Sequence, residues 1–180
     1  MRNKRDLTTG KIIAKAAKLL EKEGQHGLSL HKLARSLKIK TPSLYNHISG
    51  YDDLMEELSI YGMNILKDKW NQEELEIETL MDLFLEFAQE YPELCKLTQS
   101  PPIKVSIKWN QQADSVAAIP IKLVGELSKN KDEVVHKVRF LRSFLYGFSD
   151  LLSEEGFQKE QSLKETYAFS KKRVLEVIID

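Results

Sequence analysis

Cysteine, proline and glycine are scarce in this sequence. The chain of 180 residues has one cysteine, Cys95, together with five prolines and eight glycines. A single cysteine excludes an intramolecular disulfide and a zinc site built from cysteines, and we expect Cys95 to be a small core residue. All-β proteins need many turns, and turns are rich in glycine and proline, so the low counts predict long helices and an all-α fold.

Long apolar runs are missing as well. No run of ~18 apolar residues occurs, which excludes a transmembrane helix and a membrane partner. The basic start, residues 1–6, is not followed by the apolar segment of a secretory signal. With one cysteine, this pattern predicts a cytoplasmic protein.

Motifs for catalysis, metals and cofactors are absent too. The four histidines, at positions 26, 31, 47 and 136, lack the i, i+3 or i+4 spacing of a helical metal site. There is no glycine-rich phosphate loop and no recognisable pairing of nucleophile and base. We therefore expect no metal, no cofactor and no enzymatic activity.

What is present is a strong asymmetry of charge. Residues 1–50 hold 11 Lys and Arg against 3 Asp and Glu, whereas residues 51–180 hold 16 against 24. The net charges of +8 and −8 cancel over the whole chain. A basic end joined to an acidic body suggests that the end meets a polyanion, although chance clustering on a solvated surface is the alternative.

The basic end has the layout of a helix-turn-helix. Capping residues and apolar spacing predict a helix from Thr8 or Thr9 to about Glu23, a short helix from Ser29 through Leu37, and another from Pro42 to about His47, with Thr41 as its cap. In such motifs the second of the two short helices enters the major groove of DNA. Ser43 and Asn46, with Thr41 and Pro42, are expected to face base edges, and Lys38, Lys40, Tyr45 and His47 to meet phosphates. An ordinary helical hairpin is the competing interpretation.

The remaining residues read as further helices. Their spacing predicts helices over about 52–70, 76–91, 93–97, 110–127, 131–152 and 161–179, with Ala-Ile-Pro at 118–120 predicting a kink or a late start in the fourth of them. We divide the chain into a DNA-binding domain, residues 1–50, and a helical regulatory and dimerisation domain, residues 51–180.

Residues 7–54 resemble the DNA-binding domain of the tetracycline-repressor (TetR) family. The matching residues include Ile12 to Leu20, Gly24, Ser29 to Leu37, and the element Leu44-Tyr45-Asn46-His47. The resemblance implies a homodimeric, ligand-responsive repressor that binds a two-fold operator in double-stranded DNA. In the family, a lysine that contacts phosphate usually occupies the position of Tyr51, so this chain departs from the pattern at one DNA-binding residue.

The C-terminal part resembles the regulatory domain of one TetR subgroup, through Phe144 to Phe148 and Gly156-Phe157. The resemblance implies dimerisation through the last two helices, in agreement with their apolar stripes, and a small-molecule pocket among the middle helices. The expected dimer residues are Val138, Leu141, Leu145, Phe148, Leu152, Tyr167, Val174 and Val177. The aromatic residues that could line a pocket for an unidentified effector are Phe84, Phe87, Tyr91, Trp109, Phe140 and Phe144, although aromatics at helical spacing are more often core.

Two alternatives to the repressor remain open at this point. Tyr51 in place of lysine leaves room for a protein of the same fold that binds DNA poorly and acts through a protein partner. The second alternative is an enzyme, and a robust product in a turnover screen would reveal it.

Overall fold

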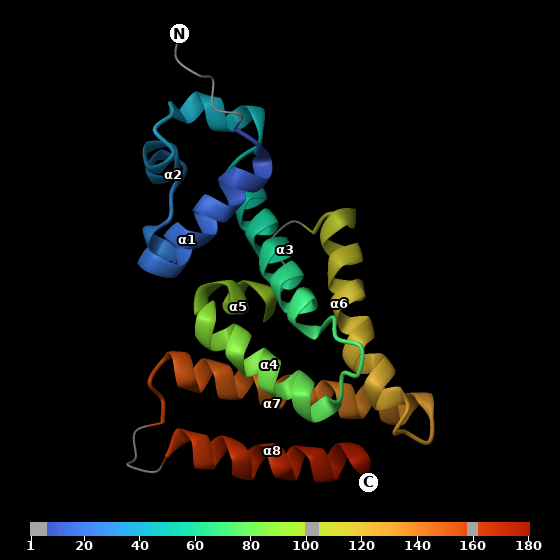
Figure 1. The fold of residues 1–180 in the computed structure, drawn as a ribbon. Coiled ribbons are helices and arrows are strands. Elements are labelled where there is room, and N and C mark those ends of the chain that lie inside the picture. The colour runs from blue at the N-terminus through green and yellow to red at the C-terminus, as the bar shows by residue number, and fades with distance from the viewer. Residues whose placement is uncertain (1–6, 100–104, 158–161) are drawn as a thin grey trace. The chain divides into compact units, whose positions relative to one another are not determined.

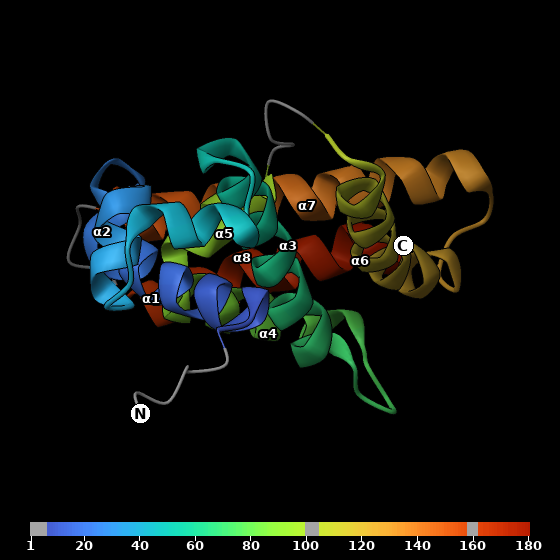
Figure 2. The ribbon, with the colours of Figure 1, turned by 90° about the horizontal axis from the view of Figure 1, so that it is seen from above.

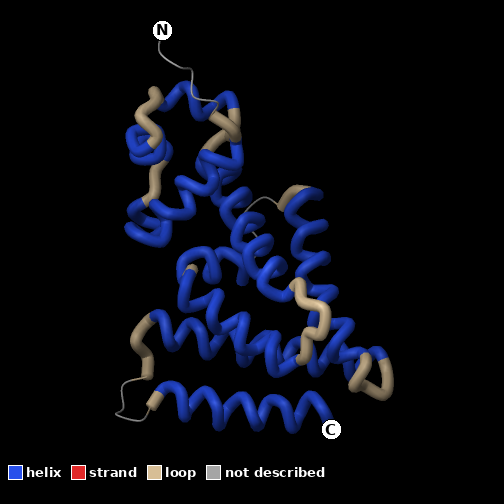
Figure 3. Tube along the Cα trace, viewed as in Figure 1, coloured by secondary structure: helices blue, strands red, loops and turns tan. Residues whose placement is uncertain are grey.

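The regular elements of the protein are helices joined by short loops, as a computed structural model shows for residues 7–99, 105–157 and 162–180 (Figures 1 and 3). In chain order they are α1 (Thr9–Gly27), α2 (Leu30–Ser36), the 3₁₀ helix η1 (Thr41–Asn46), α3 (Tyr51–Trp70), α4 (Ile77–Glu90), α5 (Pro92–Gln99), α6 (Ile107–Gly125), α7 (Lys131–Ser153) and α8 (Leu163–Ile179). No strand occurs in this part of the chain, which confirms the all-α fold.

The first helices begin where the sequence predicts. The Thr8 hydroxyl accepts a hydrogen bond from the Lys11 amide at 3.3 Å, and the Ser29 hydroxyl accepts one from the Lys32 amide at 3.2 Å. Each cap satisfies an amide that has no partner within its helix. Gly24, with φ at +69°, kinks α1 at the predicted stop, and one further turn follows it.

Two details of the predicted helices are wrong. Lys40, not Thr41, precedes η1, and no side chain caps that helix, whose backbone winds as a 3₁₀ helix. The helix that contains Pro120 starts early, at Ile107, and continues through the proline, so the alternative of a late start is excluded.

Backbone contacts divide the chain into two compact units. The N-terminal unit comprises residues 1–62 and 93–109, and the C-terminal unit comprises residues 63–92 and 110–180. From the sequence we predict a boundary between a DNA-binding domain and a regulatory domain at residues 50 and 51. The two compact units do not test that boundary, which stays a prediction.

The C-terminal unit is built around α4, α7 and α8, which pack against one another. Helices α7 and α8 lie side by side and run in opposite directions (Figure 1), and Figure 2 shows the same helices from above. Phe84 and Phe87 of α4 are almost fully buried, and the Phe84 ring meets Tyr146 of α7 edge to face, with ring centroids 4.9 Å apart. Within the described residues, no helix is long and apolar enough to cross a membrane.

Candidate DNA-binding interface and regulatory unit

The helix-turn-helix is held together by apolar side chains at its turn. Leu33 and Ala34 of α2 and Leu44 of η1 are buried, with Leu44 fully inaccessible to solvent. Because the inward position of Leu44 sets the rotation of η1, Pro42, Tyr45 and Asn46 are left exposed, while Thr41, Ser43 and His47 are half-buried. The structure thus presents the predicted base-reading residues on one short, anchored helix.

The turn between α2 and η1 carries backbone strain. The Ile39 amide donates to the Ala34 carbonyl at 3.0 Å, and the Lys38 amide donates to the Arg35 carbonyl at 3.1 Å. This pair of bonds is the Schellman ending of a helix, and it places Lys38 in the left-handed region with φ at +57°. Glycine is the usual residue at this position because a β-carbon is unfavourable there.

The lysines of the turn are available to solvent. Lys38 and Lys40 are both exposed, and in the described part of the chain neither ammonium has a carboxylate oxygen within 4.0 Å. Exposed, unpaired ammonium groups beside a helix with polar surface residues are suited to contacts with DNA phosphates.

Tyr51, by contrast, is engaged within the protein. Its hydroxyl donates to the backbone carbonyl of Gln25 at 3.2 Å, which ties the start of α3 to the end of α1. Burial, and next the charge of Asp52, raise the pKa of Tyr51 above its usual value. His47 has a local partner as well, since its Nδ1 lies 3.4 Å from the Thr9 hydroxyl.

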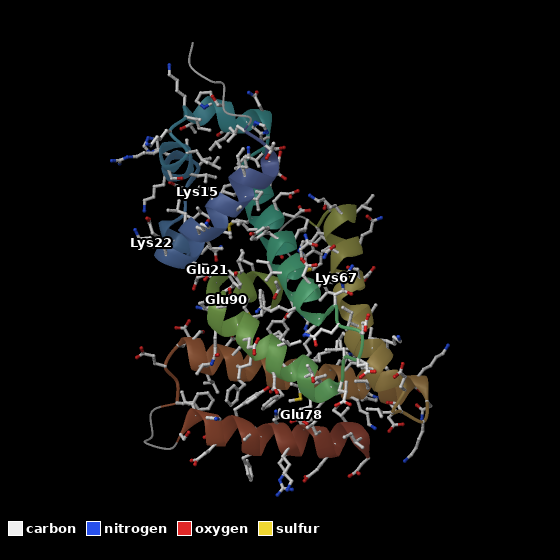
Figure 4. All side chains as sticks on the ribbon, viewed as in Figure 1. Lys15, Glu21, Lys22, Lys67, Glu78 and Glu90 are labelled. Atoms are coloured by element: carbon white, nitrogen blue, oxygen red, sulfur yellow. The ribbon has the colours of Figure 1, made fainter. Side chains whose placement is uncertain are left out.

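Sequence reasoning missed a contact between α1 and α5 in the same unit. Both carboxylate oxygens of Glu21 accept backbone N–H bonds from the start of α5, from Glu93 at 3.1 Å and from Leu94 at 2.8 Å. Figure 4 labels Glu21 on α1. Burial raises the pKa of Glu21 in spite of these two donors. No local pattern signals this cap, because its partners are 72 and 73 residues away in the chain.

Helices α5 and α6 are held on α3 by polar contacts. Ser59, buried in α3, donates to the Leu97 carbonyl at 2.8 Å and accepts a hydrogen bond from Trp109 Nε1 at 3.0 Å. Of the aromatic residues expected to line a pocket, Trp109 therefore lies in the N-terminal unit.

The other expected pocket residues belong to the C-terminal unit. Phe84 and Phe87 are core residues, Tyr91 and Phe144 are half-buried, and Phe140 is 43% exposed. Phe144 packs against Phe148, with ring centroids 5.7 Å apart. The assignment of a pocket to these residues stays a prediction.

The expected dimer residues also divide by burial. Leu141, Leu145, Phe148 and Val174 are at most 7% exposed and are covered by helices of their own chain. Val138, Leu152 and Tyr167 are half-buried, and Val177 is 50% exposed. The exposed apolar side chains of α7 and α8 are instead Val135, Phe140, Leu151, Leu163, Phe169, Val177 and Ile179.

A network of charges joins α4 to α8. The Lys171 ammonium lies 2.9 Å from Glu78 and 3.0 Å from Asp82, and Glu78 is labelled in Figure 4. Burial, and next the charge of Asp82, raise the pKa of the Tyr167 hydroxyl far above its usual range. Hydrogen bonds to the same two carboxylates raise the pKa of Lys171 against the effect of burial. No group of three or more metal-ligating side chains was found among the described residues.

Comparison with known proteins assigns the family. Residues 77–171 match the family model described as the tetracyclin repressor-like C-terminal domain. The Bacillus subtilis (strain 168) protein YobS, described as an HTH-type transcriptional regulator, is 30% identical over 172 residues, which cover 91% of this chain and 88% of that protein. The chain belongs to the TetR family of transcriptional regulators.

Solved TetR-family structures share this fold over nearly the whole chain. The BioQ structure with its double-stranded DNA operator has a TM-score of 0.69 and 15% identity, and covers 96% of this chain and 98% of that one. The Streptomyces coelicolor protein ActR in complex with actinorhodin has a TM-score of 0.71 and 14% identity, and covers 96% of this chain and 97% of that one. At these identities the likeness shows the fold alone.

Proposed function

We propose that this TetR-family regulator is a homodimeric repressor that binds a two-fold operator and responds to a small-molecule effector. The observation that carries the DNA-binding part is the anchored helix η1, which presents Pro42, Tyr45 and Asn46 to solvent next to the exposed Lys38 and Lys40. BioQ, a protein of the same fold, was solved with its DNA operator.

The proposed dimer rests on the exposed surface of α7 and α8. Phe140, Leu151 and Phe169 are 43%, 49% and 65% exposed, an unusual concentration of large apolar side chains on one helical pair. Gly147 lies on α7 between Phe140 and Leu151, and a β-carbon there would meet nothing within 4 Å. Glycine inside a helix costs about 0.5–1 kcal/mol relative to alanine, and nothing within the protomer explains it. Close approach of a second copy of the chain would explain a glycine at this position.

The proposed response to an effector rests on membership of the TetR family and on a protein of the same fold. ActR was solved with actinorhodin bound. A ligand can shift the equilibrium between DNA-binding and released forms only by its difference in affinity for the two. We expect half-sites about one helical turn apart, ~34–36 Å, as for other two-fold helix-turn-helix dimers.

The experiment is selection of bound sequences from a random DNA library, with the mass of the complex determined. The proposal predicts an enriched two-fold motif, bound by a dimer, with affinity that falls steeply in salt. A monomer at micromolar concentration, both alone and on DNA, would contradict it.

The dimer surface has its own test at Gly147. Substitution Gly147→Ala should stabilise the isolated protomer, because alanine favours helix, yet weaken dimerisation in analytical ultracentrifugation. Gly125→Ala is the matched control, since a β-carbon at Gly125 also meets nothing within 4 Å. An unchanged dimerisation constant for Gly147→Ala would exclude close packing at this position.

The partner-dependent alternative has one observation in its favour. The Tyr51 hydroxyl donates to Gln25, so the position where the family usually has lysine brings no charge to DNA. If DNA binding is the function, Tyr51→Lys should raise affinity and steepen the salt dependence. If the protein acts through a protein partner, that substitution should leave regulation unchanged.

A further inference from the structure

Lysines form a line along the outer face of α1. Four of them, which we call the lysine stripe, are exposed and follow one another at spacings of four, three and four residues: Lys11, Lys15, Lys18 and Lys22. At about 100° per residue this spacing confines them to an arc of about 60° and spreads them over about 16 Å of the helix axis. The buried residues Ile12, Ala16 and Leu20 take the opposite face of the helix. Figure 4 labels Lys15 and Lys22 on α1.

The lysine stripe is unfavourable for the helix that carries it. Like charges three or four residues apart repel each other on a helix surface. Lys11 lies in the first turn, where the helix dipole opposes a cation, and no acidic residue in that turn offsets it. The dipole favours cations near the C-terminal end, but this does not account for the first two lysines of the stripe. The reason for the complete line therefore lies outside the helix.

The carboxylates of α1 do not neutralise the lysine stripe. The helix has two acidic residues, and both have partners on other elements: Glu21 accepts hydrogen bonds from two amides at the start of α5, and Glu23 lies 2.7 Å from the Lys32 ammonium. In the described part of the chain, no carboxylate oxygen lies within 4.0 Å of the ammonium groups of Lys15, Lys18 and Lys22. The positive charge of these three lysines is therefore available to a partner.

The lysine stripe begins beside the helix that is proposed to read DNA. The Thr9 hydroxyl lies 3.4 Å from Nδ1 of His47, the residue after η1, and Lys11 follows two residues later in the same compact unit. A regular line of charges of one sign suits a linear polyanion, such as a DNA strand with a phosphate about every 3.4 Å of duplex axis. Residues 51–180 of a second copy are acidic as well, but they mix 24 acidic with 16 basic residues. DNA therefore matches the stripe better.

We propose that the lysine stripe is a second phosphate-binding surface, which holds the DNA backbone beside the segment that η1 contacts. Lys15, Lys18 and Lys22 each neutralise a phosphate without reading bases, so the stripe enlarges the footprint of each half-site. The inference rests on the proposed DNA binding by η1, and it adds a contribution to affinity that does not depend on sequence. Contacts of this kind release counterions and make binding depend strongly on salt.

The salt dependence of DNA binding tests the stripe without a known operator. Fluorescence anisotropy measures binding to a labelled random-sequence duplex of about 30 base pairs, or roughly three turns. A triple variant, Lys15→Gln with Lys18→Gln and Lys22→Gln, should lower the slope of log affinity against log salt by about 2.7, because each phosphate contact contributes about 0.9. If this variant instead changed only the association of one dimer with another in analytical ultracentrifugation, the stripe would bind a second copy and the proposal would be wrong.

A matched triple variant controls for net charge. It removes three exposed lysines of the C-terminal unit, Lys122→Gln, Lys131→Gln and Lys172→Gln, and should leave the salt slope near that of the wild type. Equal slopes for the two triple variants would overturn the proposal. The stripe variant should also unfold at the wild-type temperature or above it, because glutamine is a good helix former and the repulsion is gone. A lower unfolding temperature would show that the lysines stabilise α1 and would overturn the proposal as well.

Cross-linking tests whether the stripe touches DNA or only attracts it from a distance. The one cysteine of the chain, Cys95, is 2% exposed, so a cysteine introduced on the surface can be labelled selectively with a photoactivated azidophenacyl group. Lys18→Cys should then cross-link to the duplex, as should Lys40→Cys beside η1, whereas Lys172→Cys should not. Cross-links from Lys40→Cys but not from Lys18→Cys would refute the stripe alone. No DNA binding and no cross-link from either variant would refute the proposed function as well.

Discussion

Two helices, α2 in the N-terminal unit and α7 in the C-terminal unit, end in the same backbone motif with side chains of opposite charge. Lys38 has φ at +57° after α2, and Glu155 has φ at +54° after α7. In each case the next residue closes the helix, with Ile39 bonded to Ala34 at 3.0 Å and Gly156 bonded to Leu151 at 2.7 Å. The geometry is alike, so the difference lies in what each side chain does outside the helix.

The neighbouring residues explain why a lysine follows α2, but they do not explain why a glutamate follows α7. Lys38 lies beside Lys40 in the basic part of the chain, next to the helix proposed to read DNA. Glu155 follows Glu154 in the acidic part, and nothing in the structure explains an acidic residue there. The comparison shows that a strained backbone position gains a functional meaning only from its neighbours.

Of the substitutions that distinguish the two units, we expect the largest change in stability from one in the core of the C-terminal unit. Phe84→Ala should lower the free energy of unfolding by about 3–5 kcal/mol, because it removes a large buried ring and leaves a cavity. Urea unfolding followed by circular dichroism measures the loss. Ile107→Ala, at a position 78% exposed, should change stability by no more than about 0.5 kcal/mol. Similar losses for the two variants would contradict the burial that the structure assigns to them.

The direct contacts with DNA are expected to come from the N-terminal unit. Lys40→Ala and Tyr45→Ala should weaken binding to every duplex, and Lys40→Ala should lower the salt slope by about 1, because it removes a phosphate contact. Ser43→Ala should instead change the preference among sequences, since Ser43 is placed to face base edges. Fluorescence anisotropy on selected and random duplexes distinguishes the effects. Lys172→Ala, at an exposed lysine of α8, is the control for net charge, and equal effects of Ser43→Ala on both duplexes would count against its role.

Alkaline pH should destabilise the C-terminal unit through Tyr167 and Lys171. Both groups have a folded pKa above their unfolded values of about 10 to 10.5, so the folded state holds their protons more tightly. The stability they provide is present below those values and is lost as the pH rises beyond them, by up to about 1.4 kcal/mol per pH unit for the half-buried tyrosine. Urea unfolding between pH 8 and 11 measures the slope. Tyr167→Phe should flatten it, and an unchanged slope would show that other groups dominate.

The smallest change in stability is expected from substitutions at the ends of α2 and α7, which test the comparison directly. Lys38→Gly and Glu155→Gly should each relieve left-handed strain and raise stability by about 1 kcal/mol. Only Lys38→Gly should also reduce DNA affinity, because it removes a proposed phosphate donor. Paired thermal unfolding and DNA titrations measure both quantities. If Lys38→Gly left DNA affinity unchanged, the left-handed conformation at Lys38 would be no more connected with DNA binding than the one at Glu155.

The helix-turn-helix was predictable because its determinants are local. Thr8 and Ser29 cap amides three residues away, and the inward position of Leu44 follows from helical spacing within one short segment. The sequence by itself therefore determined the all-α class, the main helices and the inward side of η1, whereas the residues that contact DNA stay a prediction.

Only the tertiary structure decided which apolar stripe faces which neighbour. Leu141, Leu145, Phe148 and Val174 have the spacing of an interface, yet helices of the same chain cover them. Spacing gives the face of a helix but not what packs there. The same holds for polar groups: Glu21 reaches α5 and Lys137 is buried in α7, although both residue types ordinarily lie in water. Burial and long-range capping arise from contacts between segments distant in the chain, and no local pattern records them.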